Sequence, residues 1–272
     1  MNIDAKIIAD SISPTGVRLT TFQLKYQRLF HSEVMTHRML SRNASSSRAI
    51  PVQKMISQVW NNPAAPVHWG QNKPGMQAKE SLTGWRLYFA KSLWAWSGRL
   101  MCAFAYGMMK IGLHKQVANR ILEPWQYIHV VVTATDWDNF FKLRNHKDAQ
   151  PEFQQLAALM WLKYIGNIPN KLAVGEWHLP YIDSQEIMKY TTGELLKMSA
   201  ARCARVSYVK HDGLNSSYEE DVKLYSRLID SDPPHMSPVE HQATPTKNKA
   251  YSGNFRGWKQ FRKIIEVEKN NE

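Results

Sequence analysis

Cysteine is scarce in this chain of 272 residues, which contains only Cys102 and Cys203. Two thiols can build neither a disulfide framework nor a four-thiolate zinc site, so we expect a reducing compartment, with the cytoplasm as the default. A secretion signal is not expected either, because Asp4 and Lys6 interrupt the N-terminal segment before an apolar core could form.

Long uncharged hydrophobic runs are also missing. The most apolar stretch, residues 82–110, still carries Arg86, Lys91 and Arg99. A membrane-spanning helix instead needs about 20 nearly uncharged residues. We therefore predict that this stretch forms a buried helix and that the protein has no membrane partner.

Acidic residues are outnumbered, because 35 Lys and Arg stand against 23 Asp and Glu and give a formal net charge of +12. This excess predicts an anionic partner: a nucleic acid, a nucleotide, a phosphorylated cofactor or a membrane surface. Charge alone does not choose among these partners. The hydrophobic fraction of 43% and the charged fraction of 21% are typical of a globular protein and exclude a disordered chain.

Several common catalytic sequences are absent. The chain has no Gly-x-Gly-x-x-Gly or Walker sequence, which disfavours a Rossmann or P-loop nucleotide site, and no Gly-x-Ser-x-Gly elbow. His235, Ser237, Glu240 and His241 lie close in sequence, but their spacing matches neither His-Glu-x-x-His nor a cysteine-pair zinc site. We therefore predict no metal site, and we interpret Cys102 as a core residue rather than a nucleophile.

The pattern that is present consists of short strands separated by long helices. Alternating and β-branched residues predict strands at 5–8, 18–26 and 127–135, with a turn at 11–16. Helical spacing predicts helices at 28–40, 81–122, 138–165, 192–205 and 218–229. Residues 41–51 are expected to form a Ser-rich loop, and 50–78 an irregular Pro-rich segment. This pattern indicates an α+β fold with a small sheet.

The segment from Thr36 to Arg48, THRMLSRNASSSR, could bind phosphate. It gathers guanidinium groups, hydroxyls and backbone N–H groups into one helix end and loop, and such groups bind phosphate oxygens. The alternative is an ordinary Ser-rich loop with solvated arginines, and composition alone favours this alternative.

Two other segments could contribute polar groups to a cavity. In residues 135–153, helical spacing places Asp136, Asn139 and Leu143 on one face with Arg144 beside them, although a solvated amphipathic helix has the same pattern. In residues 114–120, Arg120 lies near a helix C-terminus, where an interaction with the helix dipole is the simpler explanation.

These segments resemble the flavin-dependent thymidylate synthase family. The family signature is Arg-His-Arg-x-x-Ser-x-Asn-Glu-x-Ser-x-Arg, and the chain matches it at His37, Arg38, Ser41, Asn43, Ser46 and Arg48. The sequence DNFFKLRNHKDAQPEF, residues 138–153, is similar to a later family segment. HKQVANRILEP, residues 114–124, is similar to the helix that precedes that segment.

The order of the motifs departs from the usual family order. ARVSY at 204–208 and HMSPVEH at 235–241 usually come first, but here they follow residue 200. The sequence therefore resembles a circular permutant of the family, which is physically reasonable because chain termini often lie close together. The resemblance implies one domain over residues 1–272, with a small, mostly antiparallel sheet flanked by long helices and an insertion around 50–110.

The resemblance also implies a cofactor, substrates and an assembly. Family members are homotetramers that bind FAD between subunits and transfer a one-carbon unit from methylenetetrahydrofolate to C5 of dUMP, giving dTMP, with NADPH as reductant. By resemblance, FAD would contact His37, Arg38, Asn43, Asn139, Leu143, Ser207, Ser237 and Glu240. The nucleotide would contact Glu33, Ser46, Ser47, Arg48, Arg120 and Arg144. The catalytic residues would be Arg144, beside the base, and His235, near the flavin and the folate.

Three departures from the signature concern the substrate. Thr36 stands in place of the first arginine, Ala44 in place of the glutamate, and Glu33 in place of a glutamine. A carboxylate at position 33 could accept a hydrogen bond from an exocyclic amine, as on cytosine, or it could pair with an arginine. A flavin-dependent hydroxymethylase that acts on dUMP or dCMP is therefore the closest alternative enzyme.

A different class of function is a basic nucleic-acid-binding protein. Such a protein would bind phosphates with Lys and Arg and stack bases on Trp85, Trp94, Trp125 or Trp258. Most of these aromatic residues fall at helical core spacing, so we do not expect nucleic acid to be the main partner. The tail at 247–263 interleaves basic and aromatic residues, which leaves a secondary nucleic-acid contact open.

Overall fold

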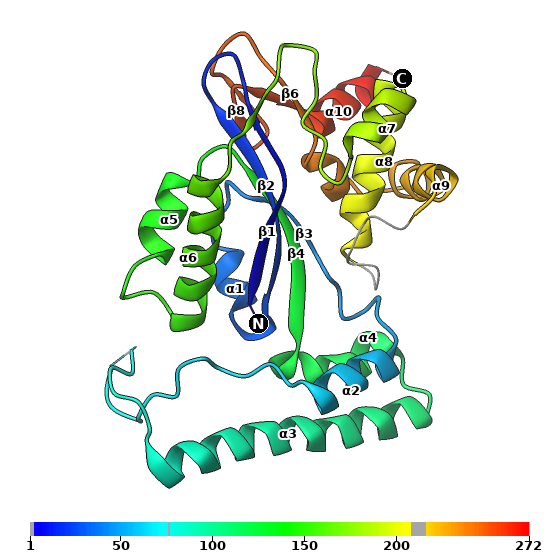
Figure 1. Cartoon of the computed structure of the whole chain (residues 1–272). Coiled ribbons are helices and arrows are strands. Elements are labelled where there is room, and N and C mark those ends of the chain that lie inside the picture. Colours follow the sequence, from blue (N-terminus) through cyan, green and yellow to red (C-terminus); the bar gives the residue numbers. More distant parts are fainter. Residues whose placement is uncertain (1–2, 76, 208–215, 272) are drawn as a thin grey trace.

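A five-stranded sheet forms the centre of this computed structural model, which describes residues 3–75, 77–207 and 216–271 (Figure 1). The strands are β1 (Asp4–Ile12), β2 (Arg18–Gln27), β3 (Ser41–Ala44), β4 (Tyr127–Ala134) and β5 (Asn170–Lys171). They lie in the order β3-β4-β2-β1-β5, and all neighbours pair antiparallel except β5, which runs parallel to β1. The predicted strands and the mostly antiparallel sheet are thus confirmed.

Helices cover both faces of this sheet, and side chains alternate between the faces along each strand. Phe22 of β2 lies opposite Val132 of β4, and both pack against α5 (Asp138–Arg144) and α6 (Pro151–Gly166). Val131 points to the other face, where it contacts Cys203 of α8 (Thr192–Arg205). Figure 1 shows α5 and α6 on one side of the strands and α8 on the other. The α+β architecture is therefore confirmed.

The C-terminal third of the chain packs beside this second face. It contains α7 (Ser184–Lys189), α8, α9 (Tyr218–Ile229), η3 (Ser237–Glu240), β6 (Ala243–Pro245), β7 (Tyr251–Ser252), β8 (Phe255–Arg256), β9 (Trp258–Gln260) and α10 (Phe261–Asn271). Buried Arg202 of α8 pairs with Glu186 of α7 at 2.6 Å and with Asp221 of α9 at 2.9 Å, which ties the three helices together. Capping boxes at Thr191 and Ser217 begin α8 and α9, so both predicted helices are confirmed.

A further group of helices lies at the end of β4 and comprises α2 (Val52–Asn61), α3 (Gly84–Lys110), α4 (Lys115–Ala118) and η2 (Asn119–Trp125) (Figure 1). Val52, Met55 and Val59 share one face of α2 and pack against Cys102 and Ala105 of α3. The prediction that residues 50–78 are irregular is therefore wrong for 52–61. The prolines around this segment favoured an irregular structure, but its apolar residues recur at helical spacing and form a short helix.

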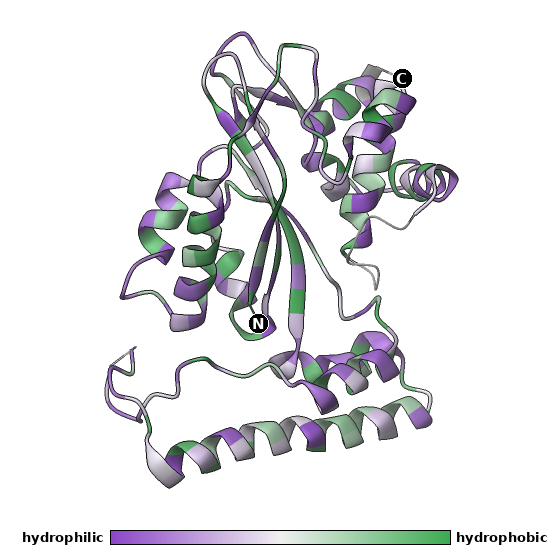
Figure 2. Cartoon of the chain, in the orientation of Figure 1, coloured by the Kyte–Doolittle hydropathy of each residue, from purple (hydrophilic) through white to green (hydrophobic). Residues whose placement is uncertain are grey.

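Helix α3 forms where residues 82–110 predict a helix, but it is not buried as expected. Its buried residues are Gly98, Cys102 and Ala105, whereas Trp85 and Trp96 are 69% and 63% exposed. Figure 2 shows hydrophobic residues along the whole length of α3. Hydropathy alone does not show which sides of a helix have a neighbour, and α2 and η2 cover one side only. Within the described residues, no helix is both long and apolar enough to cross a membrane.

Other boundaries differ from the predicted ones. The helix expected over 138–165 is divided into α5 and α6, because a polar turn at 145–150 precedes Pro151. The helix expected over 81–122 ends near Gly112, whose φ of +86° breaks the helical backbone. Of the helix expected over 28–40, only η1 (Arg28–Phe30) and α1 (His31–Val34) form. Residues 41–44, expected in a loop, form β3 because β4 offers them a pairing edge.

Candidate functional site

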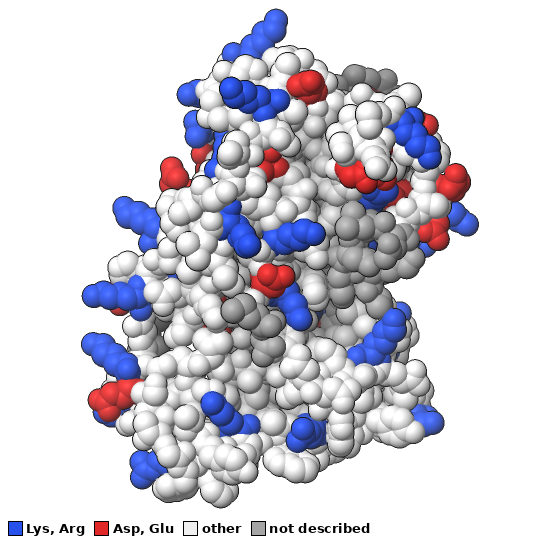
Figure 3. Space-filling view, in the orientation of Figure 1, with Lys and Arg blue, Asp and Glu red and all other residues white. Residues whose placement is uncertain are grey.

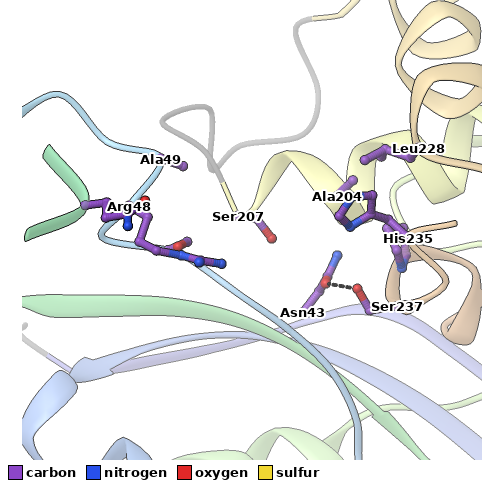
Figure 4. Close-up of a pocket in the computed structure, with 11 residues that line it drawn as sticks. Asn43, Arg48, Ala49, Ala204, Ser207, Leu228, His235 and Ser237 are labelled. Carbon is purple, nitrogen blue, oxygen red and sulfur yellow. Dashed lines mark hydrogen bonds between the residues drawn. The ribbon is translucent and has the colours of Figure 1, made fainter. Parts of the chain in front are cut away.

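Residues from distant parts of the chain line one cavity of about 400 Å³ beside β3 (Figure 4). Part of the signature segment forms one wall, and two C-terminal segments form the other. Its lining includes Asn43, Ser46, Arg48, Ser207, His235 and Ser237. The structure therefore brings together six residues that the sequence predicts to bind flavin or nucleotide or to act in catalysis.

Asn43 joins the two walls of this cavity. Its register opposite Val131 turns its side chain toward α8, where the amide nitrogen donates to the carbonyl oxygen of Cys203 at 3.0 Å. The hydroxyl of Ser237, on η3, donates to the amide oxygen of Asn43 at 2.9 Å. Asn43 is only 6% exposed, so both ends of its buried amide have a partner.

Arg48 gives the cavity its positive charge. Figure 4 shows its side chain reaching from the signature wall toward Ser207 and Asn43. No acidic side chain is among the lining residues, and no ion pair with Arg48 occurs in the described part of the chain. A guanidinium beside hydroxyl and amide groups suits an anionic ligand such as a phosphate.

Arg144 lies in a second cavity of about 1410 Å³, lined also by Glu33 and by residues from 68–80 and 147–151. Its guanidinium donates to Nε2 of His37 at 2.8 Å and to the Thr36 hydroxyl at 3.2 Å. Glu33 is 3.7 Å away, and the ring of Phe153 lies 4.7 Å beneath the guanidinium carbon. Arg144 is thus fixed on several sides by neighbouring residues, of which Glu33 also lines the cavity.

His37 is neutral in this arrangement. Burial, followed by the positive charges of Arg144 and Arg42, lowers the pKa of His37 to about 4. A neutral ring can accept the hydrogen bond from Arg144 at Nε2, whereas a protonated ring could only donate. His37 therefore acts as an acceptor that orients Arg144.

Arg42 is a structural residue that the sequence did not single out. Its guanidinium donates to the carbonyl oxygens of Val34, Met35 and His37 at 3.3, 2.9 and 3.2 Å, and so fixes the backbone that carries His37. The only available signal was the alternation of Ser41, Arg42 and Asn43, which places Arg42 on the face opposite its neighbours once the segment is known to be a strand.

The predicted site residues consequently divide between two faces at the edge of the sheet. Arg42 and Asn43 are neighbours in β3, yet one contacts the His37 segment and the other contacts α8 and η3. Glu33, His37 and Arg144 lie on the first side, whereas the cavity that contains Arg48 lies on the second. A single chain does not bring these two groups into one cavity.

The remaining predicted residues lie outside both cavities. Ser47 and Arg120 both hydrogen-bond to Glu123, at 2.6 and 2.9 Å. Glu240 pairs with Arg262 of α10. Arg38, Asn139 and Leu143 are exposed to solvent. Tyr208 of the ARVSY motif lies outside the described residues. Over the described ranges, no group of three or more His, Cys, Asp and Glu side chains could hold a metal ion.

Comparison with solved structures places the fold among known proteins. A UMP/dUMP methylase, PolB from Streptomyces cacaoi bound with 5-Br UMP, has 14% sequence identity and a TM-score of 0.50, over 60% of this chain and 89% of that chain. The same protein bound with 5-Br dUMP gives the same identity and score, over 60% and 90%. Thymidylate Synthase X from Helicobacter pylori with FAD and dUMP has 16% identity and a TM-score of 0.37, over 54% and 67%. No curated protein matches the chain.

Comparison with protein families gives a direct result. The family described as Thymidylate synthase complementing protein matches residues 12–170, which is more than half of the chain. This match includes the signature segment and Arg144, whereas the ARVSY and HMSPVEH segments follow it. The chain therefore belongs to the thymidylate synthase complementing family, the flavin-dependent thymidylate synthases, and is a thymidylate synthase-like enzyme of that FAD-dependent kind.

Proposed function

We propose that this protein transfers a one-carbon unit from methylenetetrahydrofolate to C5 of dUMP, with FAD as cofactor and NADPH as reductant, and so produces dTMP. The observation that carries the proposal is the cavity in which Asn43, Ser46 and Arg48 of the signature meet Ser207, His235 and Ser237. Family membership supports the flavin-dependent reaction. The similar fold of PolB, solved with 5-Br UMP and 5-Br dUMP, is consistent with a pyrimidine nucleotide as substrate.

The donor set of the cavity fits a phosphorylated cofactor and substrate. Arg48 supplies a cation that has no ion pair among the described residues, while Asn43, Ser207 and Ser237 supply amide and hydroxyl groups around the same cavity. We propose that these residues hold FAD and the nucleotide, together with Ser46 and, from the resemblance, His37, Arg38, Asn139, Leu143 and Glu240. Ser47 and Arg120, which the resemblance also assigns to the nucleotide, bond to Glu123 instead. The flavin would supply the hydride chemistry, and the protein would supply position and charge.

We propose that Arg144 and His235 are the catalytic residues. Arg144 is held by His37 and stacked on Phe153, so the protein's own residues fix its position. A fixed cation beside the base would stabilise the negative charge that develops on a uracil carbonyl as C5 becomes nucleophilic. His235 faces the same cavity as Asn43 and Ser237, where it would lie beside the flavin and the folate.

We further propose that the site is completed between subunits of a homotetramer. The support is that Arg144 and Arg48 lie in different cavities of one chain, on opposite sides of the sheet edge. The apolar side chains that α3 exposes, such as Trp85, Leu93 and Trp96, offer a surface for subunit contacts. The single domain, its insertion around 50–110 and the permuted motif order are part of the same proposal.

A hydroxymethylase acting on dUMP or dCMP is the second candidate. The observation that favours it is the position of Glu33, whose carboxylate lies 3.7 Å from the Arg144 guanidinium in the second cavity. Such a carboxylate could accept a hydrogen bond from the exocyclic amine of cytosine while Arg144 donates to the ring acceptors. Replacing Glu33 by Gln would then change the preference between dCMP and dUMP.

A nucleic-acid-binding function has less support. Figure 3 shows Lys and Arg side chains spread over the visible face of the molecule rather than gathered into one stripe. Trp258 is fully buried, and Trp94 and Trp125 contact each other, so these three rings are not free to stack on bases.

The test is a reaction with defined substrates. FAD-loaded protein is incubated with methylenetetrahydrofolate, NADPH and either dUMP or dCMP, and the product is identified by mass. A methylated dUMP supports the first proposal, whereas a hydroxymethylated nucleotide supports the second. No product from either nucleotide would contradict both.

A further inference from the structure

One carboxylate oxygen, Oε1 of Glu123, lies where three donors meet. The Ser47 hydroxyl donates to it at 2.6 Å, and Arg120 donates to it at 2.9 Å. Arg28 approaches the same oxygen to 3.2 Å. Two guanidinium groups thus neutralise Glu123 while its oxygen accepts from the signature segment.

A second residue of η2 binds the same stretch of backbone. The buried side chain of Asn119, one turn before Glu123, donates to the carbonyl oxygens of Ser47 at 2.7 Å and of Ile50 at 2.9 Å. Lys115, from α4, donates to the carbonyl oxygen of Ala49 at 3.2 Å. The segment from Ser47 to Ile50 is therefore held from one side by α4 and η2.

This attachment decides which signature side chains face the cavity. Ser45 accepts from the backbone N–H of His129 on β4 at 3.1 Å, and Ser47 is 1% exposed and turned toward Glu123. The residues between and after them, Ser46 and Arg48, line the cavity. The alternation along 45–48 is therefore fixed by the partners of Ser45 and Ser47.

We propose that Glu123 is a positioning residue that acts through Ser47 to hold Arg48 in the cavity, with Arg28 and Arg120 as its counter-ions. This inference rests on the proposed function, in which Arg48 binds the phosphate of the nucleotide. Glu123 does not line the Arg48 cavity and touches neither cofactor nor substrate in this account.

The direction in which removal of Glu123 changes nucleotide affinity separates a positioning role from a purely electrostatic one. Removing an anion near a phosphate site weakens the repulsion of the phosphate and should tighten nucleotide binding. Loss of a positioning contact instead misplaces Arg48 and should weaken nucleotide binding. Binding of the nucleoside, which lacks the phosphate, should change little in either case.

The experiment measures the Kd of dUMP, dCMP, deoxyuridine and deoxycytidine for FAD-loaded protein. Glu123→Ala and Ser47→Ala should each weaken the preferred nucleotide about tenfold, the scale of one hydrogen bond to a charged group, while the nucleoside changes less than about twofold. The double variant should be no weaker than either single variant, because both remove one interaction. Glu123→Gln, which keeps an acceptor oxygen, should lose less nucleotide affinity than Glu123→Ala. Glu268→Ala, on the exposed side of α10, is the control for charge.

Each other outcome overturns the inference. Unchanged or tighter nucleotide binding in Glu123→Ala and Ser47→Ala would show that neither residue positions Arg48. Equal losses of affinity for the nucleotide and the nucleoside would show that the substitution disrupts the site as a whole and not the position of Arg48. If Glu123→Ala does not fold, Ser47→Ala and Glu123→Gln decide by the same criteria. If the unaltered protein binds neither nucleotide, the proposed function fails first, and the inference fails with it.

Discussion

The Ser237 hydroxyl donates a hydrogen bond to the amide oxygen of Asn43 at 2.9 Å, although 194 residues separate them in the sequence. Asn43 belongs to the signature, and Ser237 belongs to the HMSPVEH segment that follows the family match. The bond therefore connects two motifs at opposite ends of the chain in one cavity wall. A substitution at either residue should therefore change the binding of the same ligand.

Ser237→Ala should weaken FAD binding by about threefold to tenfold, because one hydrogen bond that orders the cavity wall is lost. The Kd is measured by the quenching of flavin fluorescence on titration. The matched control is Ser97→Ala, whose hydroxyl donates to the carbonyl oxygen of Trp94 within α3. Equal FAD affinity in the unaltered and Ser237→Ala proteins would separate the C-terminal segment from the flavin site.

Arg144→Ala should fold and keep FAD but lose turnover by about a hundredfold or more, since a fixed cation at a developing charge is removed. Arg144→Lys should recover little, because a lysine cannot maintain the contacts to both His37 and Thr36. Steady-state kcat and the flavin content of the purified variants are the measurements. Normal kcat in Arg144→Ala would disprove its catalytic role.

Two buried histidines should make the protein sensitive to acid. Burial lowers the pKa of His178 to about 3, and burial together with the neighbouring His178 lowers the pKa of His241 to about 3. Both rings are bound by hydroxyl groups: His178 by Ser11 and Thr21, and His241 by Thr133.

Below about pH 6.5 these histidines become protonated in the unfolded chain but stay neutral in the folded protein. Their contribution to stability is therefore complete above about pH 6.5 and is lost as the pH falls toward 3. When the pH falls from about 6 to about 5, each of the two histidines should lower the free energy of unfolding by about 1 kcal/mol. Urea unfolding at both pH values tests this in the unaltered protein, His178→Asn and His241→Asn. A pH dependence that neither substitution reduces would contradict the assignment.

The exposed side of α3 should carry subunit contacts. Trp96→Glu should lower the oligomeric state, because burying an unpaired carboxylate in an apolar contact is costly. Light scattering after size exclusion measures the mass. Lys91→Glu, a charge change on the flank of the same helix, is the control. A tetramer that survives Trp96→Glu, or a monomer without any substitution, would rule out this surface.

Much of the fold could be predicted because its elements have strong local signals. The valines of β4 and the capping residues of α8 and α9 are visible in the sequence, and all three elements form. Strand β3 was not predicted, because four residues are too few to show a period and β4 supplies the pairing edge. The exposure of α3 was not predicted, because hydropathy does not show which sides have a neighbour.

The candidate site shows the same division. Asn43, Arg48, His235 and Ser237 were found from motifs, because a motif keeps residues at fixed spacing. The contacts of Glu123 were not found, because its partners Ser47 and Arg28 lie far away in the sequence and only the fold brings them together. Nor did the sequence indicate that Arg144 and Arg48 lie on opposite sides of the sheet edge, because that depends on the tertiary path of β3.

The most direct test of the proposed function is the visible absorption spectrum of the purified protein after FAD has been added and the excess removed. We predict that flavin bands remain with the protein, because the cavity around Asn43, Arg48 and Ser237 provides the cation and the hydrogen-bonding groups that such a ligand needs. A colourless protein that retains no FAD would contradict the proposed flavin-dependent function.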